Sequence, residues 1–113
     1  MEIVANPGPL SPYPRTVRVG EGYVWVLNGN TGTVTKIDPT QRTIAAAITV
    51  DISRDPQTLA IGYGACWIPN ADGTLTRIDA NTDAITVDNI APSLNDVVLS
   101  HGSVWVTTFP GQG

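Results

Sequence analysis

The chain has 113 residues, of which 42% are hydrophobic and 14% charged, and its net charge is −4. This composition is typical of a folded domain and excludes a disordered chain, because there are enough apolar residues to form a core. The six basic residues are scattered without a run or stripe, so neither nucleic acid nor an anionic membrane surface is an expected partner.

We expect no disulfide, membrane-spanning helix or signal peptide in this sequence. Cys66 is the single cysteine, so a disulfide within the chain is excluded. No apolar run approaches the length of about 18 residues that a membrane-spanning helix needs. The first residues, MEIVANPGPLSP, lack a basic segment followed by a long apolar one, so we expect no signal peptide in this chain.

Residues 1–14 form a proline-rich lead-in. A short β-like run at 2–5 is followed by prolines that prevent regular pairing between strands. We interpret this segment either as a loop or as the end of a preceding structural unit. The prolines are Pro7, Pro9, Pro12 and Pro14.

Short β-strands separated by turn residues fill the rest of the chain. They are rich in Val, Ile, Thr and aromatic residues, and each ends at Gly, Asn, Asp or Pro. The alanines near residue 46 are compatible with a helix, but the surrounding β-branched residues favour a strand. The predicted strands are 16–19, 23–27, 33–37, 43–50, 59–61, 66–68, 74–78, 84–87, 97–99 and 103–107.

These strands repeat along the chain. The stretch 20–38 returns as 62–79, and the sequence LSHGSVWVTTF opens a third copy. Trp25, Trp67 and Trp105 are spaced 42 and 38 residues apart, and a glycine lies three residues before each of them. A period of this length with β-type content predicts a β-propeller, with one four-stranded sheet per repeat.

The fold class we predict is all-β, a β-propeller fragment of about two and a half four-stranded antiparallel blades. Blade 1 spans 15–55, blade 2 spans 56–93, and 94–113 form the first half of blade 3. A closed propeller has about 4 to 8 blades. The chain is therefore expected to be a piece of a longer protein or to assemble with further copies of itself.

The tryptophans, the cysteine and two aspartates are expected to have structural roles and not to bind a ligand. The tryptophans recur in the strand that we expect to be most buried, which indicates packing between blades. Cys66 aligns with valines of the other repeats, which indicates a small buried residue. Asp38 and Asp79 follow the third strand of their repeats, where aspartate commonly forms a turn.

The turns supply the candidate binding residues. Asn28, Asn30, Asn70 and Asp72 follow the second strand in successive repeats, and we expect such turns to converge on one face. Tyr23 and Tyr63 are aromatic residues near turns, where a ligand could contact them. His101 lies in a turn, where a solvated histidine is the alternative to a binding role. We predict no catalytic residue, metal ligand or cofactor.

The repeats VWVLNGNTGTVTKIDPTQRTI and CWIPNADGTLTRIDANTDAI resemble the YVTN/NHL-type β-propeller repeat. The resemblance covers about residues 15–108. It implies a relationship to extracytoplasmic sensor and binding domains, and to the lyases that inactivate streptogramin B antibiotics. Those lyases carry a His and Glu metal site, which one histidine and two glutamates in this chain cannot complete.

We therefore expect a non-catalytic binding or scaffold module that contacts proteins, peptides or glycans through its loop face. Two alternatives remain. The chain could belong to a streptogramin lyase-like enzyme whose catalytic residues lie on other blades, or it could be a self-assembling fragment in which several chains complete one ring. Other blades, from a longer chain or from further copies, are expected partners in each case.

Overall fold

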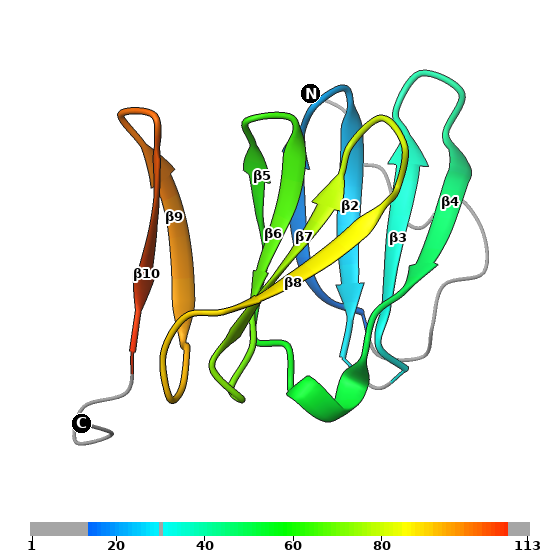
Figure 1. The fold of residues 1–113 in the computed structure, drawn as a ribbon. Helices are drawn as coiled ribbons and strands as arrows, with labels where there is room; N and C mark the ends of the chain where they lie inside the picture. The colour runs from blue at the N-terminus through cyan, green and yellow to red at the C-terminus, as the bar shows by residue number, and fades with distance from the viewer. Residues whose placement is uncertain (1–13, 30, 109–113) are drawn as a thin grey trace.

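Three antiparallel sheets follow one another along the chain (Figure 1). The computed structural model describes residues 14–29 and 31–108. Sheet 1 contains β1 (Pro14–Gly20), β2 (Tyr23–Asn28), β3 (Thr33–Asp38) and β4 (Thr43–Thr49). Sheet 2 contains β5 (Ala60–Gly62), β6 (Ala65–Pro69), β7 (Thr74–Asp79) and β8 (Ile85–Asn89). Sheet 3 contains β9 (Asp96–Ser100) and β10 (Ser103–Thr107).

This architecture confirms the predicted all-β class with four-stranded antiparallel, propeller-like blades. The strands differ from the predicted ranges only near their ends. Pro14 is the first residue of β1, which pairs only with β2 within the described residues, and the first residue of an edge strand is a position where proline is tolerated. The remainder of the predicted lead-in, 1–13, lies outside the described residues, and the blade boundaries stay predictions.

One short helical segment was not predicted. The 3-10 helix η1 (Ile52–Arg54) lies in the crossing from sheet 1 to sheet 2, and the Asp51 carboxylate accepts a hydrogen bond from the Ser53 amide at its start. In the described ranges, 14–29 and 31–108, no helix has both the length and the apolar character needed to span a membrane.

Two-residue turns join the first two strands of each sheet. Glu21, Tyr63 and His101 occupy the first turn position with φ of 52°, 52° and 54°, and a glycine with positive φ follows each of them. Two successive residues with positive φ define the turn whose twist matches that of paired strands. The glycines before each tryptophan therefore mark the hairpins that set the register of the repeat.

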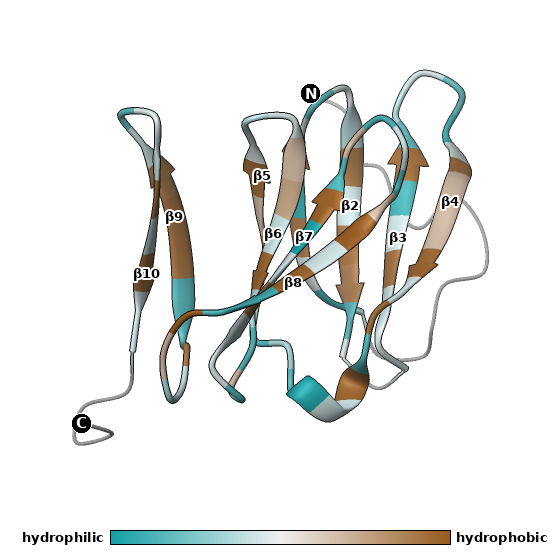
Figure 2. Cartoon of the chain, viewed as in Figure 1, coloured by the Kyte–Doolittle hydropathy of each residue, from teal (hydrophilic) through white to brown (hydrophobic). Residues whose placement is uncertain are grey.

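The core lies between sheets 1 and 2. Trp25, Leu27 and Val34 from sheet 1 pack in one buried cluster with Cys66 and Ile68 from sheet 2. Apolar residues recur along the strands of all three sheets (Figure 2). The first strands of the sheets contact one another in chain order, β1 with β5 and β5 with β9. The stacking of sheets that the repeat predicts is thus present in the molecule.

The three tryptophans share one local geometry but differ in burial. Each indole N–H donates to the carbonyl oxygen five residues earlier, at 3.0 Å for Trp25, 3.0 Å for Trp67 and 3.2 Å for Trp105. Trp25 is fully buried and Trp67 partly buried, whereas Trp105 is 58% exposed. The prediction that all three pack between blades is wrong for Trp105, because no further sheet covers its face in the part of the chain that the structure describes.

The difference in burial between Trp25 and Trp105 predicts that replacing each by alanine lowers the free energy of unfolding by different amounts. Trp25→Ala should lower the free energy of unfolding by about 3 to 5 kcal/mol, because it removes a large side chain from a closed core. Trp105→Ala should lower it by about 1 kcal/mol, since most of that ring already faces solvent. Urea denaturation of both variants measures the difference, and equal losses would contradict the packing described above.

Candidate functional site

The turns and crossings of the sheets lie at two opposite edges of the strands (Figure 1). The first, which we call the crossing edge, holds the turns that join β2 to β3 and β6 to β7, and the crossings 50–59 and 90–95. The second, the hairpin edge, holds the turns that join β1 to β2, β3 to β4, β5 to β6, β7 to β8, and β9 to β10. Asn28, Asn70 and Asp72 lie at the crossing edge, while Tyr23, Tyr63 and His101 lie at the hairpin edge. The predicted site residues therefore do not form one site.

Two of the predicted asparagines are buried beneath the crossing edge. Asn28 is fully buried and its Nδ2 donates to the carbonyl oxygen of Thr33 at 2.9 Å and to Oγ1 of Thr35 at 3.0 Å. Asn70 is 2% exposed and its Nδ2 donates to Oγ1 of Thr74 and of Thr76. These amides hold the turn between the second and third strands, and Asn30 lies outside the described residues.

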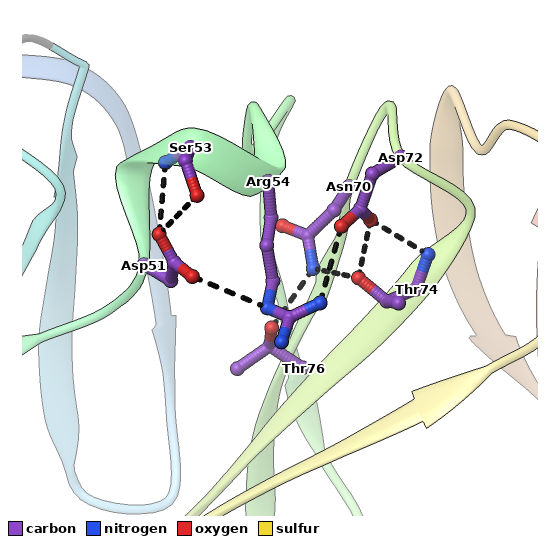
Figure 3. A network of polar contacts seen from close by, with 7 residues as sticks. All are labelled: Asp51, Ser53, Arg54, Asn70, Asp72, Thr74 and Thr76. Carbon is purple, nitrogen blue, oxygen red and sulfur yellow. Dashed lines mark hydrogen bonds and ion pairs between the residues drawn. The ribbon is translucent and has the colours of Figure 1, made fainter.

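A cluster of polar side chains lies beside Asn70 at the crossing edge, and Thr74 joins it to that amide (Figure 3). Nη1 of Arg54 donates to Oδ2 of Asp72 at 3.1 Å, and Nε of Arg54 lies 3.7 Å from Oδ2 of Asp51. The Thr74 hydroxyl and amide both donate to Oδ1 of Asp72. We call Asp51, Ser53, Arg54, Asp72 and Thr74 the Arg54 cluster. It joins η1 to the turn between β6 and β7.

Backbone hydrogen bonds also join the end of η1 to the turn between β6 and β7. The amide of Ala71 donates to the carbonyl oxygen of Asp55 at 2.9 Å. The amide of Asp72 donates to the carbonyl oxygen of Arg54 at 3.2 Å. Gly73 has a φ of 90°, and a Cβ there would collide with the carbonyl oxygen of Ala91 in the next crossing. At the crossing edge, the turn between β6 and β7 is therefore joined to one crossing by hydrogen bonds and lies in close contact with the next.

The local environment lowers the pKa of two carboxylates in the Arg54 cluster. Burial raises the pKa of Asp72, but hydrogen bonds from Thr74 and Arg54 and the charge of Arg54 outweigh it, so the net shift is downward. Hydrogen bonds from the Ser53 hydroxyl and amide lower the pKa of Asp51. Both carboxylates are therefore charged at neutral pH.

Acidic groups outnumber basic ones among the described residues of the crossing edge. Asp88 pairs with Leu75 at the end of β8, and Asp96 begins β9, so both lie at this edge. Near neutral pH the edge therefore presents a surplus of negative charge. The charged residues are Asp51, Asp55, Asp72, Asp88 and Asp96 against Arg15 and Arg54.

The three predicted residues at the hairpin edge make different contacts, although Tyr63 reaches the turn that contains His101. The Tyr23 ring contacts Trp25 edge-on, with 6.2 Å between ring centroids, and belongs to the interface of sheets 1 and 2. The Tyr63 hydroxyl accepts a hydrogen bond from the Gly102 amide at 3.0 Å, which joins sheet 2 to sheet 3. His101 is exposed, and its Nδ1 lies 2.6 Å from the Ser100 hydroxyl.

The aspartates predicted to form turns do so. Oδ1 of Asp38 accepts hydrogen bonds from the amides of Thr40 and Gln41, and Oδ1 of Asp79 accepts them from Asn81 and Thr82. No group of three or more His, Cys, Asp or Glu residues that could hold a metal ion occurs within 14–29 and 31–108. These residues thus have structural roles that need no ligand.

Arg54 is a member of the site that the sequence does not predict. Arg54 lies in a crossing that carries no strand signal, and its partner Asp72 is 18 residues further along the chain. Only the return of the chain beside the β6–β7 turn brings the two together. The acidic turn residue Asp72 was identified, because turn signals are local.

Comparison with known proteins supports the fold. Neither family models nor curated proteins match the chain. Among solved structures, apo AztD from Citrobacter koseri, a β-propeller protein, is similar with a TM-score of 0.60 and 16% sequence identity. The match covers 73% of this chain and 25% of that one, so the matched part spans about a quarter of the AztD chain. At this identity the likeness shows a propeller-like fold.

Burial of the Cys66 thiol predicts slow alkylation of the native chain. Burial raises the pKa of Cys66 to about 12, and the thiolate is the form that reacts. Iodoacetamide at pH 8 should therefore modify the urea-denatured chain and leave the native chain unmodified, as intact-mass measurement would show. Rapid stoichiometric modification of the native chain would contradict the packing of Cys66 in the core.

Asp72→Ala should destabilise the chain by about 1 kcal/mol at pH 7, because the variant loses the hydrogen bonds that hold the turn. The folded-state pKa of Asp72 lies below its ordinary value of 3.8. Its contribution to stability is therefore present above about pH 4 and is lost as the pH falls through the folded-state pKa.

The difference in urea midpoint between wild type and Asp72→Ala should accordingly be largest at neutral pH and should shrink as the pH is lowered from 7 to below about 4. Asp72→Asn keeps one acceptor oxygen but removes the charge, so its destabilisation at pH 7 should be smaller. A difference that stays constant across this range would show that the charge of Asp72 contributes nothing.

Proposed function

We propose that the chain is a non-catalytic binding or scaffold module that contacts a protein or peptide partner through its crossing edge. The observation that carries this proposal is the Arg54 cluster. Its charged side chains come from two separate segments, are held by hydrogen bonds, and remain partly exposed, with side-chain exposures of 34% for Arg54 and 35% for Asp72. A preorganised polar surface of this kind loses little conformational freedom on binding.

The charge of the crossing edge supports a basic partner. Asp51 and Asp72 stay ionised at neutral pH, and Asp55, Asp88 and Asp96 lie at the same edge. Complementary charge accelerates association and disfavours partners of like charge. We therefore expect a lysine- or arginine-rich peptide segment to bind here better than an acidic one.

We also propose that the repeats are of the YVTN/NHL type, with blade 1 at 15–55, blade 2 at 56–93 and the first half of blade 3 at 94–113. The repeated strand pattern with its apolar-Trp-apolar core supports this assignment. Such repeats occur in binding and sensor domains, which agrees with a role in binding.

A peptide array whose members vary in net charge tests the proposed function. The full chain should bind basic peptides saturably, and the affinity of the best peptide should fall as salt concentration rises. Asp72→Asn should weaken that affinity about tenfold, which corresponds to about 1.4 kcal/mol. Fluorescence anisotropy of the labelled peptide gives the dissociation constants.

Asp79→Asn provides the matched control. Asp79 also accepts backbone hydrogen bonds in a turn, and these lower its pKa, but it lies at the opposite edge. It should leave the affinity within about twofold. Absence of saturable binding, or an equal loss in both variants, would overturn the proposal.

A further inference from the structure

The dipeptide Asn28-Gly29 lies where β2 ends and the turn to β3 begins. Asn28 is the one asparagine of this sequence that a glycine follows. Glycine has no Cβ, so its backbone nitrogen can approach the side-chain carbonyl carbon of the preceding residue without steric hindrance. The equivalent asparagine of sheet 2, Asn70, is followed by Ala71, whose Cβ hinders the same approach.

This approach leads to loss of the side-chain amide in a reaction that needs only water. The Gly29 nitrogen forms a bond to Cγ of Asn28, and the negative charge of the tetrahedral intermediate develops on Oδ1. The carboxamide nitrogen then takes up the proton of the Gly29 N–H and leaves as ammonia, so a cyclic imide remains. Water opens the imide at either carbonyl and gives aspartate or isoaspartate, without any oxidant or reductant.

The fold blocks this reaction at Asn28. Its Oδ1 is buried and accepts no hydrogen bond within the described residues, so no donor there stabilises the negative charge of the intermediate. Its Nδ2 donates to the Thr33 carbonyl oxygen at 2.9 Å and to Oγ1 of Thr35 at 3.0 Å, and both bonds hold the carboxamide against β3. Because the residue is fully buried, water has no access to the ring-opening step.

We propose that Asn28-Gly29 is a latent deamidation site, which the closed β2–β3 turn keeps unreactive and which reacts when that turn opens. Opening exposes Oδ1 to water as a donor and releases the carboxamide from Thr33 and Thr35. A local opening costs less free energy than complete unfolding, so the rate of ammonia loss reports the opening of this one turn. The reaction needs no binding partner and is separate from the function proposed for the crossing edge.

The product cannot replace Asn28 in the closed turn. A carboxylate would place a charged oxygen where Nδ2 now donates to the Thr33 carbonyl oxygen, so two acceptors would meet with no proton between them. Isoaspartate would also lengthen the main chain where Asn28 pairs with Thr33 and accepts a hydrogen bond from the Gly32 amide. Deamidation is therefore irreversible, and it removes the native turn from the crossing edge.

Incubation of the full chain at pH 8, in buffer and in guanidinium chloride, tests the proposal. Peptide mapping by mass spectrometry, with an assay for isoaspartate, measures the reaction at each asparagine. In denaturant, Asn28 should react about tenfold or more faster than Asn70, because Ala71 carries a Cβ. In buffer, the reaction at Asn28 should be slower than in denaturant by about tenfold or more. Equal rates in buffer and denaturant would overturn the proposal.

Thr35→Val distinguishes local opening from complete unfolding. It removes one acceptor of the Asn28 amide, so it should raise the rate in buffer about tenfold and leave the rate in denaturant unchanged. Thr76→Val is the matched control, because Thr76 is equally buried and accepts from the amide of Asn70. This control should leave the rate at Asn28 within about twofold. An equal rise in both variants would show that the reaction follows complete unfolding, and would overturn the proposal.

Gly29→Ala tests the role of the glycine. Gly29 does not have a positive φ, and an added Cβ would meet Cδ of Arg15 at 3.0 Å, the end of a flexible side chain that can move. The variant should therefore fold, and its reaction at Asn28 in denaturant should fall to the rate of Asn70. Asn28→Asp, which carries one of the products, should lower the urea midpoint at pH 7. An unchanged rate in the first variant, or an unchanged midpoint in the second, would contradict the proposal.

Discussion

The contact between sheets 1 and 2 is the interaction on which the rest of the structure depends. A single four-stranded sheet has two faces and cannot bury either one by itself. Trp25 and Leu27 of one sheet and Cys66 and Ile68 of the other are fully buried because their faces meet. The same stacking aligns the strand ends, so that loops from successive repeats lie together at each edge.

Stacking also makes it possible for a cation to lie between the sheets. Removing the Lys36 ammonium from water costs free energy that the aromatic faces of Tyr23 and Trp25 and the oxygens of Ala80 and Asp83 offset. The lysine also fixes which turn of sheet 2 faces which strand of sheet 1. An apolar residue could fill the space, but it would not specify that pairing.

The candidate site shows how far local sequence signals reach. The turn chemistry of Asp38, Asp72 and Asp79 could be predicted because an aspartate bonds to amides within a few residues of itself. The burial of Asn70 and the pairing of Arg54 with Asp72 could not be predicted, because both depend on how a crossing returns over a turn. Nor could the sequence alone show that the tyrosines and asparagines lie at opposite edges.

The sequence by itself determined the repeat, the strands and their hairpins, because hydrophobic alternation and turn residues act over a few positions. It also identified Cys66 as buried. Only the tertiary structure decided that Trp25 is enclosed while Trp105 is 58% exposed, although both have the same local sequence pattern. Burial depends on what lies against a face, and a repeated sequence cannot distinguish a sheet with a neighbour from one without.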